Sequence, residues 1–312
     1  MADLFEFDGG EILVLGVGAA GGRVAGRGSE DASDAIGSLR VRWSAAHSQP
    51  AELIATGLEN KILLASVEGP FALRRARYSV KQREPELEQI LKGKSCVFLI
   101  GSQGEATACA MFSALAESIA ALKDVFICAL VAEPPFSVAG ADVGLHEFKD
   151  AVHLWIRVPS RILCAGMEQQ PIGAVQSHSE CKLLLIMQTL IGVLSNENAG
   201  SISIDSFQET VRGSGPFVAG IGFGTGIDAV QTAADAALFE LKKNALDLPV
   251  SGAALAMASP TDLSSYDAHL LMERFRNACD GKTLLAGFST VSYTHLRAHE
   301  TKANLVCRLL LE

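Results

Sequence analysis

Three glycines near the start of the chain have a spacing that can hold phosphate. Gly16, Gly18 and Gly21 form the pattern G-x-G-x-x-G, directly after an apolar run. Glycines in such a turn let backbone N–H groups approach an anion, which then lies at the positive end of the following helix. A strand-to-helix turn without a ligand also needs glycine, for close packing and for positive φ. The motif alone therefore leaves two interpretations open, a phosphate loop and a structural turn.

A second candidate loop lies further along the chain, in GSQGEATACA (101–110). It follows the apolar run CVFLIG and opens a helical pattern, as the first loop does. The carboxyl ends of parallel strands meet at one edge of a sheet, so two such strand ends can face one ligand.

The elements that must position these loops follow a regular alternation. Short apolar runs separated by helical patterns predict an α/β fold with a mostly parallel sheet, covered by helices on both faces. The predicted strands are EILVLG (11–16), VRWSAAHS (41–48), KILLAS (61–66), CVFLIG (96–101), VFICALVA (125–132) and LWIRV (154–158).

A long helical stretch, roughly 174–195, separates this sheet from a second, smaller α/β domain. There the pattern predicts strands at 216–224, 251–258 and 283–289, and helices at 228–245 and 265–279. The long stretch is interpreted as a connecting helix.

Composition bounds the class of protein. With 312 residues, 49% hydrophobic, the chain can bury a sizeable core. No apolar run reaches the roughly 18 residues of a membrane span, and the start is acidic where a secretory signal is basic. The seven cysteines form no C-x-x-C pair, which favours reduced core residues. We therefore expect a cytoplasmic protein.

Charge and metal-ligand patterns exclude further classes. A net charge of -9 argues against a nucleic-acid surface, and the single basic run, RRARYSVKQR (74–83), is interpreted as a solvated helix face. His295 and His299 are spaced like metal ligands, but no third ligand is near, so no metal site is expected.

An NAD site would need an acidic residue at the end of the second strand, and 41–48 contains none. An oxidoreductase with NAD in the first loop therefore remains only the least favoured alternative. The phosphate motif G-x-x-x-x-G-K-[ST] is also missing from the sequence.

Seven segments stand in a characteristic order along about residues 10–290: GVGAAGG (16–22), SAAHSQPAEL (44–53), GEATACA (104–110), EPPFSVAG (133–140), VPSRIL (158–163), SISIDSFQET (201–210) and GSGPFVAGIGFGTGIDAVQTAADAAL (213–238). In this order they resemble the FtsZ and tubulin superfamily of filament-forming GTPases, and FtsZ most of all. The resemblance implies a Rossmann-like GTP-binding domain over 1–173, a connecting helix and loop over 174–200, and a C-terminal domain over 201–290.

The resemblance also implies a ligand, GTP or GDP with or without Mg²⁺. The residues at the matching positions are Gly16, Gly18, Ala19, Ala20, Gly21, Gly22, Arg23, Gly104, Glu105, Ala106, Thr107 and Ser160. No residue of this chain is predicted to bind the metal directly.

The second loop departs from the family pattern. Glu105, Ala106, Ala108 and Ala110 stand where the family has glycines, so Cβ atoms are expected where backbone should approach an anion. The Glu105 carboxylate would repel phosphate by roughly 1 kcal/mol in water at about 4 Å. Arg23 either offsets that charge or is a surface arginine.

The base-side positions depart as well. Ala139 replaces a family Glu, Ser160 replaces an Asn, and the long helix offers Cys181 or Lys182 where a base-binding Asp is expected. A neutral or basic group cannot accept the N–H pair of guanine. The sequence therefore predicts guanine binding that is weak or lost.

Hydrolysis in this family uses an Asn-x-Asp-x-x-Asp loop of the neighbouring subunit, which polarises the attacking water. The matching positions are Ser203, Asp205 and Gln208, with Glu209 adjacent. The candidate catalytic residues are thus Asp205, Gln208 and Glu209, and the resemblance leaves open whether the chain is an enzyme.

The resulting hypothesis is a divergent FtsZ-like cytoskeletal protein that self-associates head to tail, in cell division or membrane remodelling. Division or membrane-associated partners are expected, without nucleic acid and without a transmembrane segment. The alternative is an active GTPase in which Glu105 helps to hold Mg²⁺ and Glu209 replaces the missing acid.

The last stretch, 291–312, turns basic and polar and resembles translated sequencing-adapter read-through. We expect it to be foreign, to stand in place of the last strands and the partner-binding C-terminus, and to be dispensable for stability.

Overall fold

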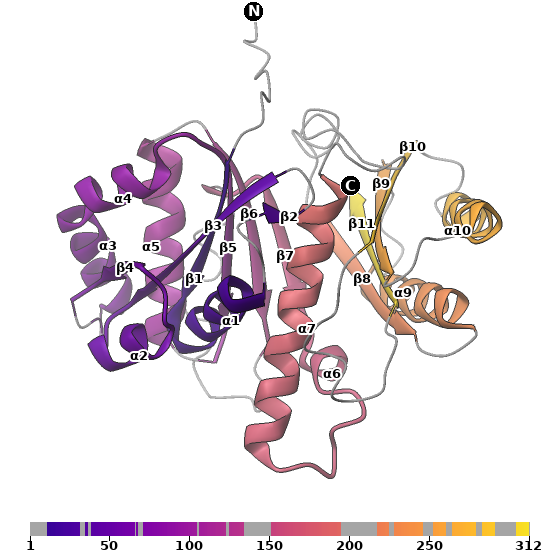
Figure 1. Cartoon of the computed structure of the whole chain (residues 1–312), viewed down its shortest axis with the longest axis horizontal. Coiled ribbons are helices and arrows are strands. Elements are labelled where there is room, and N and C mark those ends of the chain that lie inside the picture. Colours follow the sequence, from indigo (N-terminus) through magenta and orange to yellow (C-terminus); the bar gives the residue numbers. More distant parts are fainter. Residues whose placement is uncertain are drawn as a thin grey trace, which may run out of the picture. The chain divides into compact units, whose positions relative to one another are not determined.

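The computed structural model describes residues 11–31, 35–36, 39–65, 67, 71–104, 106–122, 125–133, 151–194, 217–224, 228–245, 252–259, 264–278, 283–290 and 304–311 (Figure 1). These residues fall into two compact units. The first takes its residues from Asp8–Ala35 and Leu39–Leu184, and most of the second comes from Leu185–Glu312.

The first unit is built on a parallel sheet with β1 near its middle (Figure 1). The strands lie in the order β3-β1-β5-β6-β7, and both β4 and the short β2 pair with β3. Their bounds are β1 (Glu11–Val17), β2 (Ala35–Ile36), β3 (Leu39–His47), β4 (Asn60–Leu63), β5 (Lys94–Ser102), β6 (Phe126–Ala132) and β7 (Leu154–Val158). The pairs β1–β3, β1–β5, β3–β4, β5–β6 and β6–β7 are all parallel, as predicted.

Helices cover both faces of this sheet, because successive side chains of a strand point to opposite faces. Leu13, Leu15 and Val17 of β1 pack in one core cluster with residues of α3, α4 and α5. The opposite face of β1 meets α1, which approaches Gly16 closely. The helices of this unit are α1 (Gly18–Asp31), α2 (Pro50–Ala55), α3 (Ala72–Gln82), α4 (Glu84–Leu91), α5 (Ala106–Leu122) and α6 (Ser160–Leu163). Helix α7 (Ile172–Val193) begins in the first unit, and its residues from Leu185 onward belong to the second.

The second unit has a smaller sheet in the order β10-β9-β11-β8. Its elements are β8 (Phe217–Gly224), α9 (Ala229–Ala245), β9 (Gly252–Ser259), α10 (Ser265–Ala278), β10 (Thr283–Thr290) and β11 (Asn304–Leu311). Helix α9 packs closely on β8, since a Cβ added to Gly222 would lie 1.9 Å from the carbonyl oxygen of Ala233. The predicted strands and helices of this unit are confirmed.

Residues 304–311 belong to the stretch that we expect to be foreign. They form β11, which pairs antiparallel with β9 on one side and with β8 on the other. The structure thus gives part of the stretch an inner place in the second sheet, while its origin stays a prediction.

Candidate functional site

The carboxyl edge of the first sheet brings the predicted nucleotide-binding positions together. Because the strands are parallel, β1, β5 and β7 all end at this edge. β1 leads into α1 at Gly18, β5 leads through Gly104 toward α5, and β7 leads into α6 at Ser160. In parallel α/β sheets, ligands bind in the crevice outside this edge.

The first loop is a direct strand-to-helix turn. β1 ends at Val17 and α1 begins at Gly18, so no residue intervenes. The first-turn N–H groups of α1 therefore lack helical partners and lie at the carboxyl edge, where the helix dipole favours an anion. Ala19 and Ala20 are half-buried, whereas Gly18, Gly21 and Gly22 are buried.

Packing alone requires the glycines of the motif. A Cβ on Gly16 would lie 2.2 Å from the carbonyl oxygen of Gly21, and a Cβ on Gly21 would lie 2.2 Å from that of Ile100. Gly18 has a φ of +74°, a backbone conformation that residues other than glycine rarely adopt. The motif would thus be needed to seat α1 against β1 and β5 even without a ligand.

The second loop is tied to the neighbouring strand end. The Gln103 N–H donates to the carbonyl oxygen of Ala132 at 2.9 Å, and the Gly104 N–H donates to Ser102 Oγ at 3.3 Å. Helix α5 begins two residues later at Ala106, and Thr107 on its first turn is half-buried. The backbone of this loop is therefore anchored to both β5 and β6.

The alanines of the second loop that replace family glycines divide between two surroundings. Ala108 lies against the first loop, since a Cβ on Gly18 would approach its Cβ to 2.9 Å, whereas Ala110 belongs to the core cluster. The structure does not describe Glu105 or the side chain of Ala106. The Cβ of Ala108 therefore lies beside the first loop, whereas that of Ala110 faces the core.

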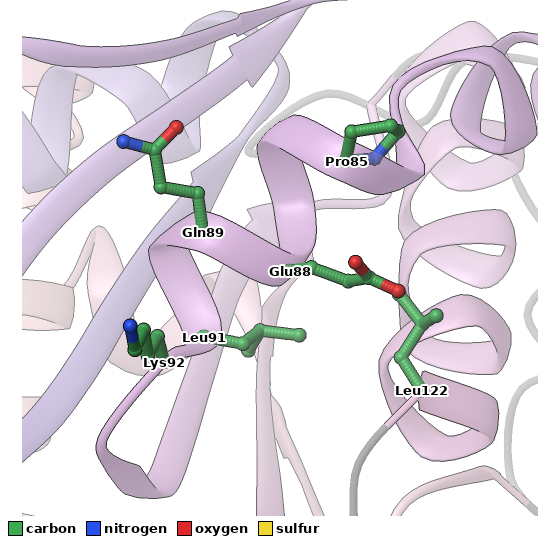
Figure 2. Close-up of a pocket in the computed structure, with 6 residues that line it drawn as sticks. All are labelled: Pro85, Glu88, Gln89, Leu91, Lys92 and Leu122. Atoms are coloured by element: carbon green, nitrogen blue, oxygen red, sulfur yellow. The ribbon is translucent and has the colours of Figure 1, made fainter.

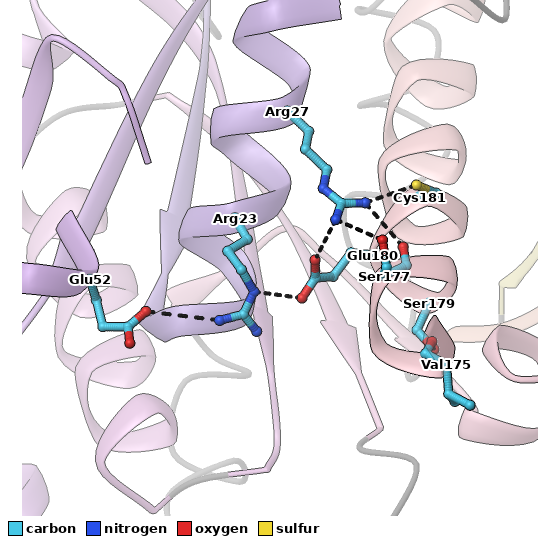
Figure 3. A network of polar contacts seen from close by, with 8 residues as sticks. All are labelled: Arg23, Arg27, Glu52, Val175, Ser177, Ser179, Glu180 and Cys181. Atoms are coloured by element: carbon cyan, nitrogen blue, oxygen red, sulfur yellow. Dashed lines mark hydrogen bonds and ion pairs between the residues drawn. The ribbon is translucent and has the colours of Figure 1, made fainter. Parts of the chain in front are cut away.

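Arg23 and Arg27 of α1 converge on Glu180 of α7 (Figure 3). Arg23 Nε donates to Glu180 Oε1 at 2.7 Å, and Arg27 Nη2 lies 3.4 Å from Glu180 Oε2. The Glu180 side chain is only 6% exposed, whereas both arginine side chains are 34% exposed. This carboxylate is therefore a buried charge held by two guanidinium groups.

Arg27 also binds residues of α7 on either side of Glu180 in the sequence. Its Nη1 donates to the carbonyl oxygen of Ser177 at 3.1 Å and to Cys181 Sγ at 3.0 Å, and its Nη2 donates to Ser177 Oγ at 2.8 Å. Arg23 Nη1 lies 3.8 Å from Glu52 Oε2 of α2. These contacts join α1 to both α7 and α2, and we call the set Arg23, Arg27, Ser177, Glu180 and Cys181 the α1–α7 clasp.

The clasp changes the interpretation of Arg23. Its Nε donor is directed at α7, so the side chain is neither a simple surface arginine nor directed solely at phosphate. A role for Arg23 toward a nucleotide stays a prediction. Sequence reasoning missed Glu180 because it weighed only Cys181 and Lys182 at this turn. The available signal was that Glu180 is the sole acidic residue of the largely apolar α7.

Two residues that the resemblance places beside the nucleotide base, Lys182 and Ser160, are also bound within the chain. Lys182 Nζ donates to the carbonyl oxygens of Ile162 at 2.9 Å and Ala165 at 3.5 Å, and burial lowers the pKa of Lys182. The Ser160 N–H donates to Glu133 Oε2 at 3.2 Å, while Glu133 Oε1 lies 2.7 Å from Arg157 Nε. The segment from β7 to α7 is therefore held by Lys182 at one end and Glu133 at the other.

Asp205, Gln208 and Glu209 lie outside the described residues, as do His295 and His299. In the ranges that the structure describes, no group of three or more His, Cys, Asp or Glu side chains could hold a metal ion. No described helix is long and apolar enough to cross a membrane.

At the position where an NAD site would need an acidic residue, β3 ends in His47. Its Nδ1 accepts the Gln49 N–H at 2.8 Å.

A hollow of about 580 Å³ lies away from this edge (Figure 2). It is lined by Pro85, Glu88, Gln89, Leu91, Lys92 and Leu122. These residues lie near the ends of α4 and α5 that precede β5 and β6, so the hollow is at the amino edge of the sheet. It is separate from the candidate site.

The chain is similar in fold to solved structures of FtsZ and CetZ proteins. FtsZ of M. jannaschii, solved as an empty dimer, matches with a TM-score of 0.79 and 18% identity over 97% of this chain and 88% of that one. CetZ2 from Haloferax volcanii, solved as a GTPγS-bound protofilament, matches with a TM-score of 0.68 and 13% identity over 97% and 93%. CetZ1 from the same organism, a GDP-bound monomer, also has a TM-score of 0.68, with 13% identity over 96% and 93%. No protein-family model and no curated protein matches the sequence.

The parallel sheet with two helix-opening loops at its carboxyl edge defines an α/β fold of the nucleotide-binding type. With the second unit included, the chain has the FtsZ/tubulin fold, as the sequence predicted.

Proposed function

We propose that this chain is an FtsZ-like cytoskeletal protein that self-associates head to tail and binds guanine nucleotide weakly or not at all. The self-association rests on the fold, which the chain shares with a dimeric FtsZ and with a CetZ2 protofilament. A head-to-tail contact does not close on itself and therefore builds filaments. The proposed role is cell division or membrane remodelling.

The observation that carries weak nucleotide binding is the α1–α7 clasp. The acid of α7, Glu180, is buried between Arg23 and Arg27, and each of its carboxylate oxygens lies beside a guanidinium group. Lys182 is likewise bound to backbone carbonyls. A guanine base would have to displace these contacts to find an acceptor on this turn of α7, and a displaced buried charge is costly.

A calorimetric titration with GTP, GDP and ATP tests this part of the proposal. We expect no heat of binding at micromolar nucleotide, and filaments in electron micrographs both with and without GTP. Micromolar GTP binding together with nucleotide-dependent filaments would overturn weak binding. Soluble monomers at every concentration would overturn self-association.

The alternative, an active GTPase, is supported by the two helix N-termini at the carboxyl edge, where α1 and α5 begin. Phosphate release from GTP at polymerising concentrations separates the two proposals. Under the main proposal the rate stays at background and Asp205→Asn changes nothing. Under the alternative, release is measurable and Asp205→Asn abolishes it, while Asp267→Asn, on α10, serves as the control.

A further inference from the structure

The outer face of α3 combines basic and aromatic side chains. Phe71, which precedes the helix, and Tyr78 are 75% and 68% exposed. At 3.6 residues per turn, they lie within one arc of about 120° with the exposed residues Arg74, Arg75, Lys81 and Gln82. We call these six residues the α3 outer face. Helix α3 is drawn at the left of Figure 1, beside α4 and α5.

The opposite face of α3 is fixed to the first unit. Ala76 and Val80 lie in the core cluster, and Ser79 Oγ accepts the Ala65 N–H at 2.6 Å. Between the two faces, the exposed Arg77 binds the two carboxylate oxygens of Glu117 on α5 through Nε and Nη2, each at 2.7 Å. The helix is therefore held rigidly, and its outer face is preorganised.

The charge of this face differs from that of the chain. The net charge of the protein is -9, yet α3 contains no acidic residue and its outer face carries Arg74, Arg75 and Lys81. The next acidic residues along the chain lie in α4, where Glu86 pairs with Arg83 at 2.6 Å. A basic face on an acidic protein orients the molecule toward an anionic surface.

Phe71 is held in an unfavourable backbone conformation, with a φ of +72°. A bulky residue rarely adopts positive φ, and this one exposes a large apolar ring at the same time. Strained residues that expose their side chains are candidates for contact with a partner. Aromatic rings between basic side chains suit the headgroup region of a bilayer, where ring and charge both find favourable surroundings.

We propose that the α3 outer face binds the surface of anionic lipid membranes. Arg74, Arg75 and Lys81 contact lipid phosphates, and the rings of Phe71 and Tyr78 enter the headgroup layer. A flat helical face of about three turns matches a planar surface. This proposal deepens the proposed role in membrane remodelling, but it needs neither nucleotide nor filament.

The test is co-sedimentation of the full chain, below its assembly concentration and without nucleotide, with phosphatidylcholine vesicles that contain 30% or no phosphatidylserine. We expect binding only to the anionic vesicles, weakened by added salt. Charge reversal by Arg74→Glu, Arg75→Glu and Lys81→Glu should reduce binding more than 100-fold, since each charge near such a surface contributes about fivefold. The control reverses Arg40, Lys92 and Arg276, which are also exposed, and should retain much more of the binding.

The aromatic part is tested by Phe71→Asn with Tyr78→Ser, because asparagine tolerates positive φ. This variant should lose the binding that persists at high salt. Equal binding by the charge-reversal variant and its control would overturn the proposal. So would equal binding to neutral vesicles, or binding of an acidic peptide to this face without any binding of vesicles. Filament assembly by a variant that no longer binds vesicles would leave the proposed self-association intact.

Discussion

Arg23 Nε on α1 donates to Glu180 Oε1 on α7 at 2.7 Å, across 157 positions of the sequence. Helix α1 follows the first glycine loop directly, so this bond ties the loop to α7. The position of the glycine loop should therefore depend on Glu180.

Replacing Glu180 by Gln should lower the free energy of unfolding by about 2 kcal/mol, because two guanidinium groups lose a buried carboxylate. Urea denaturation measures this change. The matched control is Glu52→Gln, since the Glu52 side chain is 39% exposed and lies 3.8 Å from Arg23. Its effect should be no more than about 0.5 kcal/mol. Equal effects of the two substitutions would contradict the structural role of the clasp.

Gly21→Ala should be strongly destabilising, by about 3 kcal/mol or to the point of failed folding. Its Cβ would lie 2.2 Å from the carbonyl oxygen of Ile100, and backbone cannot move aside as a flexible side chain can. Gly173→Ala on α7 is the control, because nothing lies within 4 Å of its added Cβ. Alanine is the better helix former there, so Tm should rise slightly. A native-like Tm for Gly21→Ala would show that α1 packs less closely.

The ion pair of Glu11 and Lys94 should make the free energy of unfolding depend on pH in the acidic range. The hydrogen bond from Lys94 lowers the pKa of Glu11, helped by the charges of Lys94, Arg42 and Arg40, while burial opposes the shift. A carboxyl with a lowered folded pKa stabilises the fold above its ordinary value of about 4.3 and loses that contribution as the pH falls through the folded value.

We therefore expect the urea midpoints of the parent and Glu11→Gln to differ by a constant amount between pH 6 and 8. The difference should shrink below roughly pH 4.5 as Glu11 gains a proton. Parallel curves down to pH 3 would show that the pair contributes nothing to the acid dependence.

Deletion of 291–312 distinguishes two expectations about the end of the chain. The sequence predicts unchanged or improved stability, whereas the pairing of β11 with β8 and β9 predicts a loss, because two strand edges would be left open. On the structure, we expect Tm to fall by several degrees. An unchanged melting curve would instead support the foreign origin of this stretch and its irrelevance to the fold.

The central strands β1, β5 and β6 could be predicted because they are buried on both faces and therefore form continuous apolar runs. The expected strand at 154–158 has the same bounds as β7. The predicted helix at about 174–195 likewise corresponds to α7. The sharing of one sheet edge by both loops followed from the parallel topology.

The partners of individual side chains could not be predicted. Nothing local to Glu180 indicates that Arg23 and Arg27 would meet it, since ion pairs between distant segments depend on helix packing. The glycine motif was ambiguous for a physical reason. Close packing of α1 on the sheet and close approach of a phosphate both require residues without a side chain. Ala110 was misjudged because periodicity does not reveal which turn of α5 faces the core.

The central place of β1 has a consequence for the order of folding. One edge of β1 can be closed by β3, which begins at Leu39, but the other edge must wait for β5, which begins at Lys94. At about 5–20 residues per second, the ribosome leaves that apolar edge unpaired for seconds. During this interval the nascent chain presents an open strand to other chains, so chaperone binding during synthesis should be concentrated before β5 emerges.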